Sequence, residues 1–310
     1  MKYNILISIV SWRYLNNVLN IIKKVENSMT NDDYLVIVET GGQRSNDVEQ
    51  YIAEHSNIRI IYSKTNDGFA ASHALSVKIM QEKNLDGILL LNPDLELRDN
   101  HIDILKTHIA ESENKAVLGC PVLNHSGNIL EVEYLGFPVP KSIENNIKTS
   151  LQQKKEIPPF VYDVKDIHGC FMYIPSGLVQ KNGWMDTQYF LYGEENEYLH
   201  RIICRNGGEV KVATNMYVVH ENGGTFDNEN LKCIREYYRT RNRLYNNYIF
   251  TGARSFFKFN YRFVIKYTLA RYILNLKSFK KEDVTYYNYL GHIHFLLGKR
   301  GRTFNPNDYV

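Results

Sequence analysis

The stretch LLLNPDLEL, residues 89–97, joins an apolar run to an abrupt stop. The run GILLLN at 87–92 is short and almost entirely apolar, which is typical of a strand that is buried on both faces of a parallel sheet. Pro93 restricts φ and ends such a strand, so Asp94 is held in a rigid turn directly after it. We therefore expect the Asp94 carboxylate at the edge of a sheet rather than inside it.

Similar apolar runs precede this stretch and alternate with segments of helical pattern. We expect helices over 14–29 and 69–82, and three further buried strands over 4–10, 33–40 and 57–64. Strands that alternate with helices predict right-handed βαβ units on a mostly parallel sheet. Ligands of such sheets bind beyond the carboxyl ends of the strands, which is where Asp94 and Glu39 are expected.

The second half of the chain has weaker patterns. Residues 117–175 contain short β-like runs, and the polar residues 143–157 are expected to form a mobile loop. Three further elements are expected, namely strands over 168–175 and 211–220 and a short helix over 198–207. From about residue 230 onward the pattern is helical, aromatic and basic. The sequence thus predicts an α/β domain over 1–228 and a helical C-terminal extension over 229–310.

Length and composition restrict the class of protein. The 310 residues are 44% hydrophobic, so a large core is expected and disorder is not. The four cysteines show neither a CxxC pair nor zinc spacing, which favours a reducing compartment. No run of eighteen apolar residues occurs, and the apolar part of the N-terminus is too short for a signal peptide. We therefore expect a cytoplasmic protein.

The charge is distributed unevenly along the chain. Residues 231–310 contain 16 Lys and Arg against 4 Asp and Glu, whereas residues 1–230 contain 21 against 30. A basic tail of this kind is expected to contact phosphates, either on a ligand or on a membrane surface. The stretch 255–281 interleaves aromatic with basic residues, which fits packed helices and a peripheral membrane face equally well. No recognised motif supports nucleic-acid binding.

Chemically versatile residues gather in several other segments. The segment 64–75, KTNDGFAASHAL, follows an expected strand and contains Gly68, which permits close backbone approach. A group of three acids precedes the expected helix at 198–207, and His220 ends the last expected strand. The remaining candidates are Asn66, Phe69, Trp184, Glu194, Glu195, Glu197, Arg239, Arg241 and Arg243.

In their order and spacing these segments resemble the family 2 glycosyltransferases of GT-A fold, near the bacterial rhamnosyltransferase-like branch. The resemblance covers roughly residues 4–300. Each matching segment is weak alone, and together they are fairly specific. The matches are Asn-x-Gly-Phe-Ala at 66–70, Asn-Pro-Asp at 92–94, Gly-Glu-Glu-x-Glu at 193–197 for the family's Gly-Glu-Asp-x-Asp, the late His220, and Arg-Asn-Arg at 241–243.

For the sugar donor, the resemblance implies a divalent cation, Mg²⁺ or Mn²⁺, held on the diphosphate by Asp94 and His220. Asn92 stands where the family often has an acid, so a single carboxylate would be a ligand. Glu39 stands at the family's acidic nucleotide-contacting position, whereas Thr40 and Gly41 depart from its pattern and leave the base open. The other implied donor contacts are Asn66, Gly68, Phe69, Arg239, Arg241 and Arg243.

For the sugar acceptor, the resemblance implies a catalytic base in the pair Glu194 and Glu195. Glu195 replaces the family's aspartate and is one methylene longer, so either member of the pair remains open as the base. Glu197 stands where the family has a second aspartate, and Trp184 is expected to line the acceptor cleft. The resemblance also implies inversion at the anomeric carbon.

The expected function is transfer of one sugar from a UDP- or dTDP-sugar to a hydroxyl of a surface glycan or a lipid-linked saccharide, at the inner face of the membrane or in the cytoplasm. A non-catalytic glycan- or partner-binding protein is the alternative, because Asn92, Thr40 and Glu195 depart from the family pattern. A nucleotidyltransferase is less favoured, since the segment ISIVSWRYLNN at 7–17 lacks a phosphate loop rich in Gly and Lys. The sequence leaves open the sugar, the nucleotide, the acceptor, the linkage and the oligomeric state.

Overall fold

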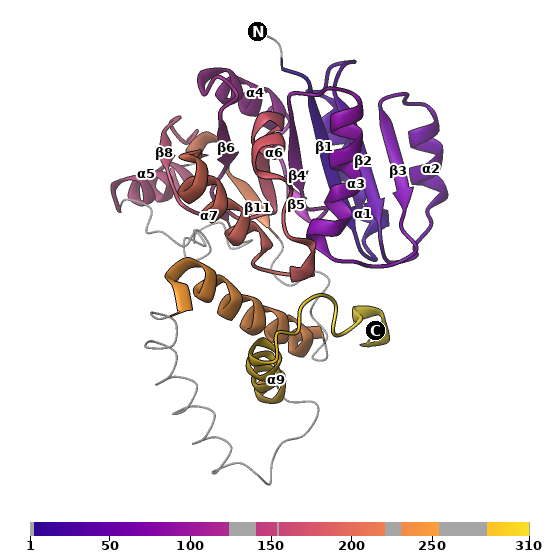
Figure 1. Cartoon of the computed structure of the whole chain (residues 1–310). Helices are drawn as coiled ribbons and strands as arrows, with labels where there is room; N and C mark the ends of the chain where they lie inside the picture. The colour runs from indigo at the N-terminus through magenta and orange to yellow at the C-terminus, as the bar shows by residue number, and fades with distance from the viewer. Residues whose placement is uncertain (1–2, 124–140, 154, 221–230, 254–283, 310) are drawn as a thin grey trace. The chain divides into compact units, whose positions relative to one another are not determined.

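The computed structural model describes residues 3–123, 141–153, 155–220, 231–253 and 284–309 (Figure 1). The chain divides into two compact units. The first unit comprises Met1–Asn66, Ala71–Trp184 and Tyr198–Gly224, and the second comprises Asp67–Ala70, Met185–Glu197 and Thr225–Val310. The second unit therefore includes two short earlier segments as well as the C-terminal region. The domain boundary at 228/229 stays a prediction.

Within the described residues, the first unit contains an eight-stranded sheet in the order β3-β2-β1-β4-β9-β6-β10-β8. Its strands pair in parallel except β9, which is antiparallel to β4 and β6, and β8, which is antiparallel to β10. The expectation of a mixed, mostly parallel sheet is confirmed. The strands are β1 Ile5–Ser11, β2 Tyr34–Glu39, β3 Ile58–Tyr62, β4 Gly87–Leu91, β6 Ala116–Gly119, β8 Val161–Asp163, β9 Phe171–Pro175 and β10 Glu209–Ala213.

Helices cover both faces of this sheet. Successive side chains of a strand point to opposite faces, so the contacts of neighbouring residues in β1 identify the helices on each face. On one face, Ile7 of β1 belongs to the same core cluster as Val18 of α1 and Leu105 of α4. On the other face, the Ser8 Oγ lies 2.7 Å from Nδ1 of His73 in α3. Figure 1 shows these helices beside the strands. The helices of the α/β part are α1 Leu15–Glu26, α2 Asn46–Ala53, α3 Phe69–Glu82, α4 His101–Glu111, α5 Lys141–Gln152, α6 Ser176–Asn182 and α7 Glu194–Asn206.

The prediction of one strand over 211–220 is wrong. The chain forms β10, then the short 3-10 helix η3 Thr214–Met216, then β11 Val218–His220. Thr214 stabilises this break, since its Oγ1 donates to the Pro158 carbonyl at 2.7 Å and accepts from the Phe160 N–H at 3.0 Å. Strand β11 thereby leaves the large sheet and joins a three-stranded sheet of described strands, β5-β11-β7, with β5 Leu95–Glu96 and β7 Val122–Leu123.

The prediction of a mobile loop over 143–157 is also wrong, because most of this segment belongs to helix α5. Its polar composition hides one buried anchor, Ile147, which is 1% exposed. Burial of a single large aliphatic side chain contributes roughly 1.5–3 kcal/mol, which offsets weak intrinsic helix preference. The sequence pattern alone did not reveal that Ile147 is buried.

The second unit is helical in its described part, as expected for the C-terminal extension. Residues 231–253 form one helix, and α9 spans Val284–Leu296. Two 3-10 helices, η2 Thr187–Tyr189 and η5 Pro306–Tyr309, complete the described elements. The whole aromatic and basic stretch 255–281 lies outside the described residues. Among the residues that are described, no helix combines the length and the apolar character that crossing a bilayer requires.

Candidate functional site

Asp94 and His220 are brought together by the small sheet of the first unit. Strand β11 runs antiparallel to β5 with His220 opposite Leu95, so the histidine lies beside the turn that contains Asp94. The Nε2 of His220 is 3.3 Å from Asp94 Oδ1 and 3.4 Å from the amide nitrogen of Asn92. All three residues were predicted from the sequence, although 126 residues separate Asp94 from His220.

The sequence analysis did not single out His168, which also belongs to this cluster. Its ring centroid lies 5.6 Å from that of His220, and its Nδ1 accepts a hydrogen bond from the Cys170 N–H at 3.1 Å. Burial, together with the neighbouring His220, lowers the pKa of His168 to about 4, against the opposing effect of Asp94. His168 is therefore neutral at physiological pH. Its only signal in the sequence was its position at the start of HGCFMYIP, which was interpreted as a strand.

The Asp94 cluster fits a cation that also binds a ligand's oxygen atoms. Asp94 Oδ1 is buried and has no hydrogen-bond partner among the described residues. Buried oxygens normally accept a hydrogen bond or bind an ion, and this one lies 3.3 Å from His220 Nε2. The described residues contain no group of three or more His, Cys, Asp and Glu side chains arranged for a metal ion. A cation held by Asp94 and His220 would complete its coordination with phosphate or water, as Mg²⁺ commonly does.

A second group of unsatisfied oxygens lies at the carboxyl ends of β1 and β2. The Glu39 side chain is fully buried, and its Oε1 accepts from the Gly41 N–H at 2.6 Å. Among the described residues, neither Glu39 Oε2 nor Ser11 Oγ has a hydrogen-bond partner. Ser11 and Glu39 are register partners in adjacent strands, and β1 is also adjacent to β4. At the spacing of neighbouring strands, the ends of β2 and β4 are roughly 10 Å apart along this edge.

The expected donor segment 66–70 is divided between the two units. Asn66 is half-buried in the first unit, and Gly68 and Phe69 belong to the second. Gly68 has a φ of +94°, and a Cβ there would lie 1.9 Å from the Phe190 carbonyl oxygen. Gly68 is therefore required because its backbone packs closely against the backbone of Phe190. The Phe69 N–H donates to the same carbonyl at 2.9 Å.

Glu194 and Glu195 begin helix α7 in the second unit, so the acids lie inside the helix rather than before it as predicted. Glu194 is 2% exposed, and its Oε2 has no hydrogen-bond partner among the described residues. Burial, with the adjacent Glu195 carboxylate, holds the pKa of Glu194 well above its usual range. Burial also raises the pKa of Glu195, which is half-buried and accepts from the Gly193 N–H at 3.2 Å. Both acids therefore have the raised proton affinity that a base working near neutral pH requires.

Glu197 and Trp184 were the predicted acceptor residues. Glu197 is buried one helical turn after Gly193, whose carbonyl accepts from the Glu197 N–H at 3.1 Å. Trp184 is half-buried, and its ring lies 5.9 Å from that of Tyr198. The Arg201 guanidinium donates to the Trp184 carbonyl at 3.1 Å, so the arginine holds the backbone before α7.

The three predicted arginines of the helix over 231–253 have different environments. Arg239 is exposed and forms an ion pair with Glu236 at 3.2 Å, and Arg243 is also exposed. Arg241 is fully buried and donates to the carbonyls of Tyr189 at 2.9 Å and Gly301 at 2.8 Å. No described carboxylate lies within ion-pair distance of Arg241. The geometry therefore favours a structural role for Arg241, in place of the expected diphosphate contact.

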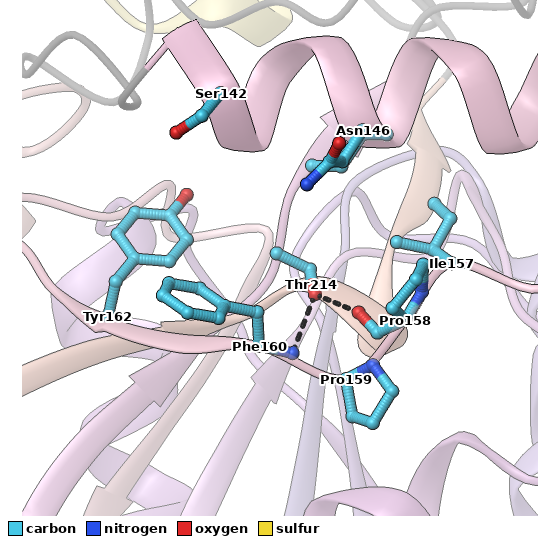
Figure 2. A pocket seen from close by; sticks show the side chains of 9 residues that line it. Ser142, Asn146, Ile157, Pro158, Pro159, Phe160, Tyr162 and Thr214 are labelled. Atoms are coloured by element: carbon cyan, nitrogen blue, oxygen red, sulfur yellow. Dashed lines mark hydrogen bonds between the residues drawn. The ribbon is translucent and has the colours of Figure 1, made fainter.

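The first unit also contains a cavity of about 400 Å³, shown in Figure 2. Side chains from α5, β8 and η3 line it, including Asn146, Tyr162 and Thr214. Its wall is largely apolar, and Ile157, Pro158, Pro159 and Phe160 are among the residues that line it (Figure 2). None of the residues predicted from the sequence lines this cavity, so the candidate site is the strand edge with Glu39 and Asp94.

No family model matches the sequence. The chain is 27% identical over 161 residues to the low-salt glycan biosynthesis hexosyltransferase Agl10 of Haloferax volcanii, which covers 51% of this chain and 50% of the relative. The chain thus spans about half the length of the curated relative that it matches.

Solved structures share the fold over most of the chain. The structure of GalNAc-T7 with UDP, GalNAc and Mn²⁺ matches with a TM-score of 0.52 and 13% identity, over 78% of this chain and 51% of that one. The structure of residues 1–349 of S. aureus TarS matches with a TM-score of 0.51 and 11% identity, over 94% and 80% respectively. A structure of the same fragment with UDP has a TM-score of 0.50, 10% identity, and coverages of 76% and 65%. At these identities the likeness shows the fold alone, and this fold is that of the GT-A glycosyltransferases.

Proposed function

We propose that the protein is an inverting, family 2-like glycosyltransferase of the rhamnosyltransferase-like branch. It moves one sugar from a UDP- or dTDP-sugar to a hydroxyl of a surface glycan or a lipid-linked saccharide. The observation that carries the proposal is the buried Asp94 Oδ1 at the carboxyl end of β4, which makes no hydrogen bond among the described residues and lies 3.3 Å from His220 Nε2. The glycan-biosynthesis hexosyltransferase Agl10, with 27% identity over half its length, supports the same class.

The nucleotide is proposed to lie along the carboxyl edge of β2, β1 and β4. Glu39 Oε2 and Ser11 Oγ, both without described partners, would accept from or donate to the nucleoside. Asn92 and Asp94 would lie at the diphosphate end of this edge. The other proposed donor contacts are Asn66, Gly68, Phe69, Arg239 and Arg243.

A divalent cation, Mg²⁺ or Mn²⁺, is proposed to be held by Asp94 and His220. When bound, such an ion supplies positive charge that stabilises a leaving diphosphate. GalNAc-T7, which shares the fold, was solved with UDP and Mn²⁺. The carboxylate oxygen of Asp94 is a ligand type that suits both Mg²⁺ and Mn²⁺.

Glu195 is proposed as the base, and Glu194 as a neutral neighbour. Glu194 is the more deeply buried acid, so it retains its proton while the half-buried Glu195 ionises. Glu195 then accepts the proton of the acceptor hydroxyl as that oxygen bonds to the anomeric carbon. The bond from the anomeric carbon to the diphosphate oxygen breaks on the opposite side, which inverts the configuration. Trp184 and Glu197 are the proposed acceptor contacts.

Peripheral contact with a membrane is part of the proposal, because a lipid-linked acceptor would be met there. The second unit exposes apolar side chains at Ile249 and Phe250 of the helix over 231–253, and at Leu296 and Leu297. The sequence over 231–310 carries 16 basic against 4 acidic residues. Apolar anchors and cationic charge act together in binding to anionic lipid surfaces. The proposed location is cytoplasmic, at the inner face of the membrane.

The proposal is tested by thermal unfolding of the full chain with UDP- and dTDP-sugars, each with and without Mn²⁺. A ligand at one hundred times its Kd stabilises the folded state by about 2.7 kcal/mol, which raises Tm by roughly 5 °C or more in a chain of this size. We expect one nucleotide to give this shift, the metal to increase it, and Asp94→Asn to abolish the increase. Asp99→Asn, an exposed aspartate of the same segment, is the matched control.

Turnover separates the enzyme from the non-catalytic alternative. In the proposed enzyme, Glu195→Gln abolishes sugar transfer to a saccharide acceptor and leaves the nucleotide-induced shift intact. A shift without any transfer by the unmodified protein would support a binding protein. If no nucleotide changes the Tm, the assignment of the donor site to the strand edge is wrong.

A further inference from the structure

The segment Tyr189–Gly193, which precedes the two acids, has an unfavourable backbone. Phe190 has φ 70° and ψ −58°, the geometry of a rare and strained γ-turn. Tyr192 and Gly193 also have positive φ, at 65° and 92°. Non-glycine residues in such conformations cost about 1–3 kcal/mol each and persist only where surrounding contacts hold them. Contacts from neighbouring residues must therefore hold this loop in place.

Asn242 supplies one set of these contacts from the middle of the helix over 231–253. Its Nδ2 lies 3.0 Å from the Tyr189 carbonyl and 2.8 Å from the carbonyls of both Leu191 and Tyr192. The Arg241 Nε donates to Asn242 Oδ1 at 2.9 Å, which fixes the orientation of the amide with its nitrogen toward the loop. Asn242 is buried, so water cannot take its place as the donor to these carbonyls.

Asn246, one turn further along the helix, holds the end of the loop next to the acids. Its Nδ2 donates to the Gly193 carbonyl at 2.8 Å, directly before Glu194. Its Oδ1 accepts from the Tyr189 hydroxyl at 2.5 Å, so the amide orientation is fixed here as well. Asn242 and Asn246 are four residues apart and lie on the same face of the helix.

Arg241 and Phe69 complete the support of the loop inside the second unit. The Arg241 guanidinium donates to the Tyr189 carbonyl at 2.9 Å, and the Phe69 N–H donates to the Phe190 carbonyl at 2.9 Å. Hydrogen bonds that involve a charged donor contribute roughly 1.5–3 kcal/mol. The summed support is of the size needed to offset the backbone cost of the loop.

We propose that Arg241, Asn242 and Asn246 are positioning residues that hold the Tyr189–Gly193 loop so that Glu194 and Glu195 enter helix α7 in the geometry required for proton transfer. The inference rests on the proposed function, in which one of these acids is the base. It assigns to Arg241 and Asn242 of the Arg-Asn-Arg segment the support of the base in place of binding to the donor diphosphate, whereas Arg243 stays a proposed donor contact. Asn242 and Asn246 do so without contacting a substrate.

The proposal predicts a change in kcat rather than in donor affinity. A misplacement of about 1 Å at a reacting group costs up to about a hundredfold in rate. In Asn242→Ala and Asn246→Ala we expect kcat to fall at least about tenfold with the donor KM changed less than about twofold. Asn247→Ala is the matched control, since Asn247 is half-buried on the same helix and has no described contact with the loop.

The pH profile of kcat provides a second readout that simple destabilisation would not move. Burial raises the pKa of both acids, so loosening the loop admits water and lowers those values toward the usual range. The acid limb of the profile therefore moves to lower pH in Asn242→Ala and Asn246→Ala. Several charged groups act on the loop and remain in these variants. They are Asp186, Glu197 on α7, Arg300, and Arg235, Glu236, Arg239 and Arg241 on the helix over 231–253.

Hydrogen exchange measured on the full chain tests the inference without reference to activity. We expect faster exchange in peptides covering 187–197 in both asparagine variants, and unchanged exchange in Asn247→Ala. Tyr189→Phe removes only the hydroxyl bonded to Asn246, so we expect a smaller increase in the exchange rate of the same peptides. This variant replaces an alanine variant that fails to fold. Unchanged loop exchange in all variants overturns the inference, as does an unchanged kcat with a loosened loop. Full activity in both Glu194→Gln and Glu195→Gln instead overturns the assignment of the base, which is a separate result.

Discussion

At the scale of single residues, Glu194 shows how burial selects a protonation state. Its side chain is 2% exposed at the start of a helix, where acids are otherwise favoured in their charged form. Loss of hydration dominates, and the neighbouring Glu195 adds repulsion, so the pKa of Glu194 is raised well above its usual range. The folded protein therefore keeps a proton at Glu194 that the unfolded chain releases.

This difference predicts how stability changes with pH. The unfolded chain loses the Glu194 proton near its ordinary pKa of 4.5, and the folded chain loses it only at higher pH. Between these values the unfolded state binds fewer protons, so the Glu194 contribution to stability falls as pH rises. Because Gln does not ionise, we expect the Tm of Glu194→Gln to rise relative to the unmodified protein between pH 5 and pH 8.

Calorimetry across this pH range measures the effect. We expect the Tm difference between Glu194→Gln and the unmodified protein to grow by about 2 °C or more, which corresponds to roughly 1 kcal/mol in a chain of this size. Glu156→Gln, at an exposed position, is the control and should show a Tm difference that does not depend on pH. A Tm difference for Glu194→Gln that narrows as pH rises would contradict the assignment.

At the scale of one element, the helix over 231–253 separates residues that the sequence groups together. Arg239 and Arg243 are four residues apart and share a face, whereas Arg241 lies between them and points elsewhere. The fully buried Arg241 donates to the carbonyls of Tyr189 and Gly301, whereas Arg239 and Arg243 are exposed. The Arg-Asn-Arg motif therefore places Arg241 in the core and Arg243 in solvent.

Alanine substitution at the three positions distinguishes these roles. Arg241→Ala leaves buried carbonyls without donors, so we expect a loss of about 2–4 kcal/mol in the free energy of unfolding. Arg239→Ala and Arg243→Ala should stay within about 0.5 kcal/mol of the unmodified protein, as exposed substitutions do. Urea unfolding measures stability, and calorimetric titration with the nucleotide measures any loss of donor affinity at the exposed positions. Equal destabilisation by Arg243→Ala would refute this division.

At the scale of the whole molecule, charge and exposed apolar side chains gather in the C-terminal part of the sequence. Residues 231–310 carry 16 basic and 4 acidic residues, and residues 1–230 carry 21 and 30. Leu296 and Leu297, at the end of α9 and directly after it, are 56% and 65% exposed and precede Lys299 and Arg300. Isolated exposed leucines are common, but apolar anchors followed by cations suit an anionic lipid surface.

This composition predicts reversible binding to vesicles that contain anionic lipid. We expect the full chain to sediment with phosphatidylglycerol-containing vesicles at low salt, and to be released at high salt because screening weakens the attraction. The double substitution Leu296→Ser and Leu297→Ser should weaken binding severalfold. Phe160→Ser removes an equally exposed apolar side chain, 52% exposed, from the first unit and is the control. An equal loss of vesicle binding in both variants would contradict the proposed membrane contact, and so would binding that does not depend on lipid charge.

The order and type of the main elements follow from the sequence because their signals are local. Continuous apolar runs predict the buried parallel strands, and apolar residues at helical spacing predict the helices between them. The position of Asp94 at the end of β4 follows from Pro93 in the same way. Prediction failed where the structure depends on burial or a contact that the local pattern does not show, as at the buried Ile147 of α5 and at the break that Thr214 stabilises between β10 and β11.

The neighbours of each candidate residue were decided only by the tertiary structure. Pairing of β11 with β5 brings His220 to Asp94, and His168 joins them from a third segment. Gly68 and Arg241 matched motifs in the sequence, but packing directs both toward the backbone before α7. The physical reason is that periodicity is a property of adjacent residues, whereas contact between distant segments depends on how whole elements pack. The sequence by itself determined which chemical groups the protein contains and on which elements they lie, and packing determined which of them meet.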